Sequence, residues 1–201
     1  MAKSPLDELR QAARGCQDCP LWANATQTVF GAGDPHARVM LVGEQPGDEE
    51  DKKGLPFVGP AGRLLDRALE AAGIERAGLY VTNAVKHFKW QLRGKRRLHK
   101  TPAQREIDAC HQWLEGEIVT IRPHVIVALG ATAAKAIIGP RFKVSMQRGR
   151  FVDSPLAPYV FATFHPSALL RLRDEEKEAA FAQLVKDLKL INKALDKGST
   201  P

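Results

Sequence analysis

A turn after a strongly apolar run carries the first side chains that could do chemistry. Val39-Met40-Leu41-Val42 predicts a buried strand, and Gly43-Glu44-Gln45-Pro46-Gly47 follows it directly. The glycines and the proline force a tight turn, which presents backbone N–H groups, a carboxylate and an amide. Ligands of open α/β folds bind at the carboxyl ends of the strands. Such a turn is also common as an ordinary strand-to-helix loop, so it needs support from the rest of the chain.

The other predicted strands also end in distinctive groups: Thr82-Asn83 in 79–85, Gly130 after 124–129, and His165-Pro166-Ser167 after 159–164. Because the carboxyl ends of parallel strands meet at one edge of a sheet, we expect these groups to converge there with Glu44 and Gln45. Their combined capacity for reading a base and for acid–base chemistry is stronger evidence for a site than any single motif.

A basic segment lies beside this predicted edge. It runs from Lys86 to Lys100, contains no acid, and its seven basic residues equal the formal net charge of +7. Phe88 and Trp90 lie among them, and cations with aromatic rings suit a phosphate backbone and unstacked bases. A solvated charged loop is the alternative. We predict an irregular loop, anchored at its far end by a capping box that starts at Thr101.

The helices and strands that would position these groups indicate an α/β protein. Helical spacing is predicted over 5–14, 60–73, 101–118, 130–138 and 174–195, alternating with near-continuously apolar strands. We therefore expect a three-layer α/β/α sandwich with a central four-stranded parallel sheet, forming one domain over residues 1–201. The longest apolar stretch, 125–134, is too short to span a bilayer, and the N-terminal residues lack the apolar core of a signal peptide. A cytoplasmic monomer is expected.

Cysteine usage points to metal or redox chemistry. Cys16 and Cys19 form a C-x-x-C pair, and Cys110 is the third cysteine. In a reducing compartment an odd set of this kind favours a metal or redox site over disulfides.

Together the motifs resemble the iron–sulfur branch of the uracil-DNA glycosylase superfamily, from about residue 16 to 173. GEQPG and the later LPFVGPAGRLL resemble the first motif of that branch and its uracil-stacking aromatic. VTNAVK resembles its base-reading strand end, and HPSALLR resembles its second motif. Two features depart from the ordinary family-four pattern: Gln45 replaces a glycine or alanine, and Lys95-Arg96-Arg97-Leu98-His99 is extra. Both are similar to the X-type uracil-DNA glycosylases, with leucine in place of an isoleucine.

The resemblance implies excision of uracil from DNA. Phe57 would stack on a flipped uracil and Asn83 would match its O4 and N3–H, with Gly43 beside them. His165, followed by Ser167, would donate a hydrogen bond to O2 and stabilise the departing uracil anion. From the residues alone, Asn83 reads equally well as a turn residue at a strand end.

The resemblance also implies that the protein stays covalently bound to DNA through His99, in a single turnover. The imidazole would attack C1′ in place of water, kept neutral by the surrounding cations and oriented by Glu44. Lys95, Arg96 and Arg97 would bind the DNA. Taken without the resemblance, His99 reads as a phosphate contact in a basic loop. Gln45 either positions backbone or excludes the hydrolytic water.

A 4Fe–4S cluster is implied as well. Cys16, Cys19 and Cys110 match three of its four ligands, and His87 occupies the position of the fourth, as histidine does in Rieske centres. Two alternatives stay open: structural zinc bound by the same four residues, or His87 in contact with DNA.

Two rival functions also remain. A multiple-turnover family-four glycosylase would use Glu44 or Gln45 to direct water, and a non-catalytic sensor would bind uracil-DNA without cleaving it. The expected partner is uracil-containing DNA, preferably single-stranded, with free uracil as the product.

Overall fold

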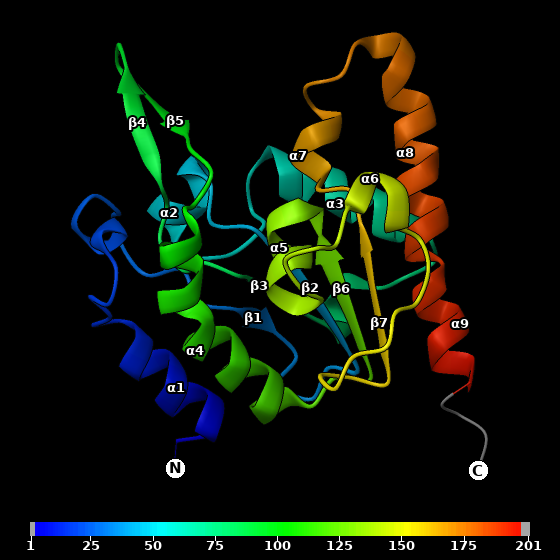
Figure 1. Cartoon of the computed structure of the whole chain (residues 1–201), viewed down its shortest axis with the longest axis horizontal. Coiled ribbons are helices and arrows are strands. Elements are labelled where there is room, and N and C mark those ends of the chain that lie inside the picture. The colour runs from blue at the N-terminus through cyan, green and yellow to red at the C-terminus, as the bar shows by residue number, and fades with distance from the viewer. Residues whose placement is uncertain (1–2, 198–201) are drawn as a thin grey trace.

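A five-stranded sheet lies between two layers of helices in the computed structural model, which describes residues 3–197 (Figure 1). The strand order is β1-β3-β2-β6-β7. The parallel strands are β2 (Val39–Gly43), β3 (Leu79–Asn83), β6 (Val125–Leu129) and β7 (Tyr159–Thr163). The predicted three-layer sandwich and its four parallel strands are confirmed. Of the predicted domain 1–201, residues 1–2 and 198–201 lie outside the described residues.

The sheet differs from the prediction by one strand. β1 (Ala32–Gly33) pairs antiparallel with β3 at the edge of the sheet, so the sheet has five strands rather than four. Two residues carry no alternation of apolar and polar side chains, which is why the sequence did not indicate this strand.

Side chains alternate between two apolar cores, one on each face of the sheet. Met40 and Val42 of β2 point into the first core, and Val39 and Leu41 point into the second. Helices α1, α4 and α5 supply the first core, whereas α3, α8 and α9 supply the second (Figure 1). Each fully buried aliphatic side chain contributes roughly 1.5–3 kcal/mol to stability, so both faces hold the strands in place.

The α-helices are α1 (Pro5–Ala13), α2 (Asp48–Lys53), α3 (Pro60–Ala71), α4 (Gln104–Ile121), α5 (Gly130–Ile137), α6 (Val144–Gln147), α7 (Pro166–Leu169), α8 (Asp174–Leu188) and α9 (Leu190–Lys197). Short 3-10 helices cover Pro20–Ala23 and Arg76–Gly78. The single helix predicted over 174–195 is divided into α8 and α9. The sequence did not predict α2, because its six residues are all charged and show no apolar face.

The basic segment is ordered as a β-hairpin, so the predicted irregular loop is wrong. β4 (Trp90–Arg93) pairs antiparallel with β5 (Arg96–His99), and Gly94 forms the turn with a φ of +61°. Exposed cations on both strands hide the usual apolar alternation. The predicted capping box is also wrong: α4 starts after Ala103, whose N–H donates to the Glu106 carboxylate at 2.6 Å.

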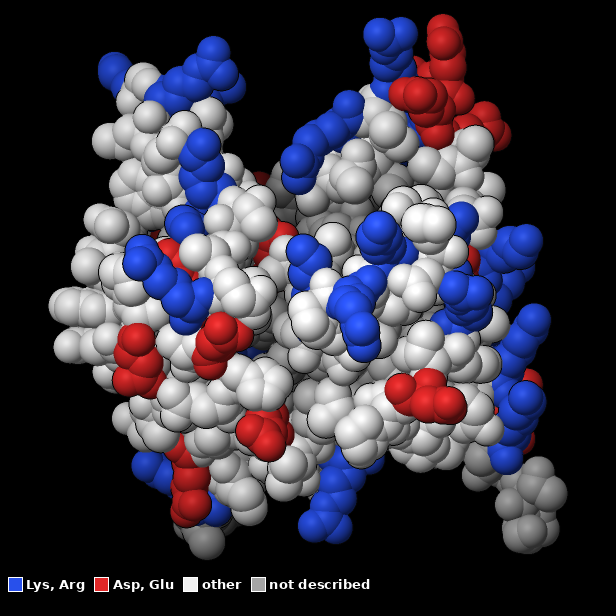
Figure 2. Space-filling view, viewed as in Figure 1, with Lys and Arg blue, Asp and Glu red and all other residues white. Residues whose placement is uncertain are grey.

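Two raised parts flank the carboxyl end of the sheet (Figure 1). One is the β4–β5 hairpin, and the other is the corner where α7 leads into α8. Figure 2 shows a hollow between them, with Lys and Arg side chains on both raised parts and acidic side chains at the outer end of α8. Within residues 3–197, no helix combines the length and apolarity that crossing a membrane requires.

Candidate active site

Gly43 and Asn83 stand side by side at the carboxyl ends of β2 and β3, where the parallel register pairs them. A Cβ on Gly43 would lie 2.4 Å from Oδ1 of Asn83 and 2.5 Å from Cζ of Phe57. Only a bare glycine therefore allows the amide and the ring to approach this strand end together. The amide offers one donor and one acceptor group, and the ring offers a flat face. Such a pair suits a planar heterocycle with polar edges.

Phe57 is held in an unusual backbone conformation. Its φ is +55°, which residues other than glycine rarely adopt. The buried Glu50 carboxylate accepts hydrogen bonds from the N–H of Gly47 at 3.1 Å and of Gly59 at 2.7 Å. Glu50 therefore connects the turn after β2 to the segment that carries Phe57. Its two hydrogen bonds help to hold the strained backbone of Phe57, and with it the ring, in place.

His165 stands at the end of β7 as a neutral hydrogen-bond donor. The N–H of Ser167 donates to its Nδ1 at 3.1 Å, so the ring proton resides on Nε2. The hydroxyl of Ser167 lies 2.8 Å from the same nitrogen and accepts from Arg171 at 3.3 Å. Burial, then His99, then Arg171 lower the pKa of His165 to about 4. Its ring stacks on Phe57 with centroids 5.9 Å apart.

Glu44 lies between His99 and Thr132. Its Oε1 is 3.3 Å from Nε2 of His99, and its Oε2 accepts a hydrogen bond from the Thr132 hydroxyl. Thr132 belongs to the first turn of α5, which follows β6, whereas Glu44 follows β2. The contact spans the gap between β2 and β6, where the order of the strands reverses and where ligands of such sheets bind.

His99 is a neutral imidazole at the last position of β5. Burial lowers its pKa below the ordinary 6.5, Glu44 opposes this shift, and Arg171 adds to it. The cations of its own segment were expected to keep it neutral, and that expectation is wrong, because desolvation is the main cause and Arg171 lies on another part of the chain. The His99 side chain is 41% exposed, so the ring remains accessible from the hollow.

Gln45 closes the base of the hairpin. Its Nε2 donates to the carbonyls of Lys89 at 3.2 Å and Lys100 at 2.9 Å, and its Oε1 accepts from the Lys89 N–H at 2.9 Å. These residues flank β4 and β5, and the Lys100 N–H also donates to the Lys89 carbonyl at 2.9 Å. A glycine or alanine could make none of the three side-chain bonds. Gln45 therefore positions the backbone that carries His99.

Arg97 stabilises the hairpin rather than lining the hollow. Its guanidinium pairs with Asp48 at 2.5 Å and Asp51 at 2.7 Å, and it lies over the rings of Phe88 and Trp90. The expected contact of Arg97 with DNA therefore gives way to a contact with α2. By contrast, the other two predicted cations of this segment, Lys95 and Arg96, are exposed.

The aromatic residues of the basic segment are structural. Phe88 is 1% exposed, so it cannot stack on a base. The indole N–H of Trp90 donates to the Asn24 carbonyl at 2.9 Å, which leaves its ring packed at the foot of the hairpin. The expected platform for unstacked bases is therefore wrong for Phe88, whereas Trp90 is half-buried.

The three cysteine thiols gather near the start of α4. Cys19 and Cys110 pack in one small apolar core. Burial is the main cause that raises the pKa of Cys110 to about 11; Lys86 opposes the shift, and Cys16 and Cys19 add to it. N–H groups already point at two sulfur atoms, from Lys86 to Cys110 at 3.2 Å and from Trp113 to Cys16 at 3.2 Å. Buried sulfur atoms with N–H donors suit thiolates that a cation neutralises.

His87 is connected to the same region through Thr28. The Thr28 hydroxyl donates to the Ala13 carbonyl at 3.1 Å, which also accepts from the Cys16 N–H at 3.1 Å. Thr28 must then accept from Nε2 of His87, 3.0 Å away, so the His87 lone pair lies on Nδ1. Burial lowers the pKa of His87, which keeps it in the neutral form that metals bind. Within 3–197, no three His, Cys, Asp or Glu side chains already form a closed metal site.

Several residues of the site carried no signal in the sequence. Thr132, Asp48 and Asp51 act through contacts with distant segments, and Glu50 binds backbone N–H groups of the turns on either side of it, so no local period indicates any of them. One cue was present: Asp48 to Asp51 are four consecutive acids, opposite in charge to the basic segment that two of them meet in the fold through Arg97. A buried acid such as Asp51 needs a cationic partner, which this segment could supply.

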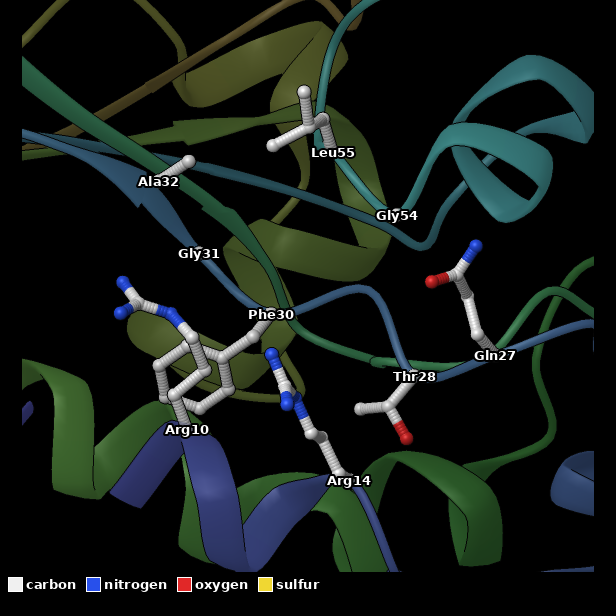
Figure 3. A pocket seen from close by; sticks show the side chains of 9 residues that line it. All are labelled: Arg10, Arg14, Gln27, Thr28, Phe30, Gly31, Ala32, Gly54 and Leu55. Carbon is white, nitrogen blue, oxygen red and sulfur yellow. The ribbon is translucent and has the colours of Figure 1, made fainter. Parts of the chain in front are cut away.

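A separate pocket of about 270 Å³ lies between α1 and the segment 27–32, apart from these groups (Figure 3). Arg10 of α1 and Arg14, which directly follows α1, line it together with Phe30 and Leu55. It shares no lining residue with the arrangement around Glu44 and His99. Arg10 is already paired with Asp7 at 2.7 Å, and we assign no ligand to this pocket.

Comparisons with known proteins agree with the geometry. The family model described as the uracil DNA glycosylase superfamily matches residues 30–189. A Type-4 uracil-DNA glycosylase of Thermotoga maritima is 40% identical over 85% of this chain and 86% of its own length. One from Pyrobaculum aerophilum is 34% identical over 92% of each chain, and a Type-5 uracil-DNA glycosylase of that organism is 30% identical over 74% of this chain and 69% of its own. The chain therefore belongs to the uracil-DNA glycosylase superfamily.

Proposed function

We propose that this protein excises uracil from DNA and then remains covalently attached through His99, as the X-type members of the superfamily do. The observation that carries the proposal is the neutral imidazole of His99 beside the Glu44 carboxylate, on a hairpin whose base Gln45 closes. The test is a labelled oligonucleotide with one uracil, boiled in detergent with the protein and run on a denaturing gel. A protein-sized shift that requires uracil supports the proposal, and its absence contradicts it.

Recognition would use the pocket at the ends of β2 and β3. A base must leave the helical stack before a glycosylase can act on it. Phe57 would then cover one face of the uracil, and the Asn83 amide would pair with O4 and N3–H, which cytosine presents with the opposite polarity.

Departure of the base would use His165. Breaking the N-glycosidic bond leaves its electron pair on uracil and positive charge on the sugar. The Nε2–H of neutral His165 can donate to O2, where the negative charge develops. Because the imidazole is uncharged, it provides this hydrogen bond without giving up a proton.

Capture would use His99 and Glu44. A lone pair of the imidazole forms the bond to C1′, and the ring then carries positive charge. Glu44 stabilises that charge, while Thr132 keeps the carboxylate in place. An imidazole bonded to C1′ has no easy leaving group, so the adduct persists and the protein turns over once.

A multiple-turnover glycosylase is the second candidate. Thr132 orients Glu44 at the mouth of the pocket, where a carboxylate could equally direct a water molecule at C1′. The Type-4 relatives support this candidate. In that case the gel shows no shift, and abasic sites exceed the number of protein molecules.

The substrate would be DNA in which the uracil is easily extruded, with single strands preferred. Extrusion from a single strand costs less than extrusion from a duplex. The exposed Lys95 and Arg96 would contact phosphates on one side of the hollow. Arg97 is left out of this role.

We also propose that Cys16, Cys19, Cys110 and His87 hold a 4Fe–4S cluster. The three thiols, two of them buried, the N–H donors on two sulfur atoms and the free Nδ1 of His87 fit such a group. When bound, it would join the N-terminal segment to the start of α4 and to the strand end of β3, a structural role.

The purified protein is expected to be brown and to contain about four iron atoms per chain, as this cluster type requires. Cys110→Ser should lose both iron and colour, whereas His87→Cys should keep them, because thiolate is the usual ligand. Iron analysis and the visible spectrum check this. Stoichiometric zinc that persists after anaerobic reconstitution with iron and sulfide would contradict the proposal.

Gly43→Ala is expected to slow uracil excision strongly at little cost in stability. The added Cβ would lie 2.4 Å from Asn83 Oδ1 and 2.5 Å from the Phe57 ring, so both side chains must leave their positions. We expect uracil release to fall by about 100-fold, as for other small displacements in active sites. Gly78→Ala is the matched control, because no atom lies within 4 Å of its added Cβ. Equal activity of the two variants would show that this pocket does not bind uracil.

A further inference from the structure

A buried ion pair lies under the end of β3. Lys86 and Glu117 are both 0% exposed, and Nζ of Lys86 is 2.6 Å from Oε2 of Glu117. Nζ also donates to the Thr82 hydroxyl at 2.7 Å and to the Asn83 carbonyl at 2.8 Å. An ammonium group has three protons, so its donor capacity is used entirely inside the protein.

Glu117 is satisfied equally fully. Its Oε1 accepts from the N–H of Gly31 and from the Tyr80 hydroxyl, both at 2.9 Å, and the Thr82 hydroxyl lies within 3.0 Å of both oxygens. The carboxylate thus joins the segment before β1, the interior of β3 and the middle of α4. These partners lie in the segment before β1 and on β3 of the sheet, and together they fix the position of the carboxylate.

Lys86 is also held at its backbone. Its N–H donates to Sγ of Cys110 at 3.2 Å, while its side chain reaches back to the carbonyl of Asn83. Thus one residue touches a proposed cluster ligand at one end and the peptide of the proposed base-reading residue at the other. His87, the proposed fourth ligand, is the next residue in the chain.

Stability alone does not account for this arrangement. Moving two charges into a protein interior is costly, and apolar or neutral replacements of similar volume are often as stable as the buried pair. The pair instead fixes the orientation of the Asn83 peptide, because Nζ can reach its three acceptors together only when the Asn83 carbonyl points toward it. The amide of Asn83 must be placed within a fraction of an ångström to read a base edge.

We propose that Lys86, held by Glu117, is a positioning residue that sets Asn83 for uracil recognition and couples the three-cysteine region to the pocket. This inference rests on the proposed role of Asn83 in binding uracil. It requires no contact between Lys86 and the substrate.

The test is the double variant Lys86→Met/Glu117→Gln. Methionine keeps the length of the lysine side chain, and the glutamine oxygen can still accept from Gly31 and Tyr80 while its amide donates to Thr82. The buried charge is thereby removed without leaving a single unpaired charge. We expect the thermal midpoint, the iron content and the affinity for uracil-free DNA to stay close to those of the unmodified protein. The single-turnover rate of uracil release should fall about 10- to 100-fold, the usual loss when a supporting contact is removed.

Tyr80→Phe is the matched control. It removes a hydrogen bond from the same carboxylate but has no link to Asn83, so uracil release should remain normal. If the double variant releases uracil at the normal rate, or if Tyr80→Phe loses as much, the proposal is overturned. Should the double variant fail to fold, Gly31→Ala displaces Glu117 and Tyr80, since its Cβ would lie 2.3 Å from Oε1 of Glu117 and 2.4 Å from the Tyr80 hydroxyl; Tyr80→Phe then shows what the change at Tyr80 alone does. A folded Gly31→Ala protein with normal uracil release also overturns the proposal.

Failure of the proposed function gives a different result. In that case the unmodified protein releases no uracil. The measurement is then its preference for uracil-DNA over thymine-DNA in equilibrium binding. Loss of that preference in the double variant, with retention in Tyr80→Phe, supports the positioning role in a sensor. An unchanged preference overturns it.

Discussion

Replacing His99 by alanine or serine is expected to remove the covalent adduct completely. The imidazole is the nucleophile in the proposed reaction, and neither replacement offers a ring nitrogen. Uracil release should continue, since Asn83, Phe57 and His165 lie outside the hairpin, and burial, the main cause of the low pKa of His165, does not involve the His99 ring. The denaturing gel should then show no protein-sized shift, and alkaline cleavage should reveal abasic DNA instead.

His36→Ala is the control for this variant, because His36 is exposed and lies between β1 and β2, away from the hairpin. The control should trap DNA as the unmodified protein does. A shift that survives in both His99 variants would mean that another residue attacks C1′. Loss of uracil release as well as of the adduct would mean that His99 takes part in breaking the bond to the base.

The proposed role of His99 also determines whether adduct formation rises or falls with pH. Burial lowers the pKa of His99 below 6.5, so the neutral, nucleophilic form is already complete at neutral pH. Adduct formation should therefore be level between about pH 7 and 8 and fall only as the pH drops through the lowered pKa. The rate of adduct formation is measured at each pH by stopping the reaction at successive times and running the denaturing gel.

Glu44→Gln is expected to slow adduct formation by about 100- to 1,000-fold, in the range of other charged groups that act on a transition state. The amide keeps the shape and the contact with Thr132 but cannot offset the positive charge that develops on the sugar and then on the imidazole. The fall should be seen in the single-turnover rate at saturating DNA rather than in affinity, because the charge appears only during the reaction.

Glu49→Gln makes the same change in charge on a partly exposed acid of α2 that pairs with Lys53 and Arg63. It should behave as the unmodified protein does. Equal rates for Glu44→Gln and the control would exclude a catalytic role for this carboxylate. A loss of affinity with an unchanged rate would instead assign Glu44 to DNA binding.

The architecture could be predicted from the sequence because it depends on local patterns. Apolar runs such as that of β2 indicate strands buried on both faces, and Pro60 marks the start of α3. The same reasoning brought the strand-end groups to one edge of the sheet, where Gly43 and Asn83 are in register. The superfamily was likewise identified from the order of its motifs.

The hairpin could not be predicted in the same way, because its strands are held by contacts from far along the chain. Arg97 is stabilised by Asp48 and Asp51, and Gln45 binds both ends of the hairpin. Counting charges along the segment assigned Arg97 to DNA, since the sequence does not show which cations are already paired inside the fold.

The closure of the hairpin base has a consequence for how such a protein could arise. Lys89 and Lys100 are hydrogen-bonded to each other, so the chain leaves the scaffold and returns to it at one place. Gln45 binds the same two residues, so the base of the hairpin is fixed to the strand end of β2. In the proposed reaction the attacking group is therefore carried on a unit that joins the base-excising scaffold at one place, and a lineage would gain or lose covalent capture through one insertion and one substitution at the position of Gln45.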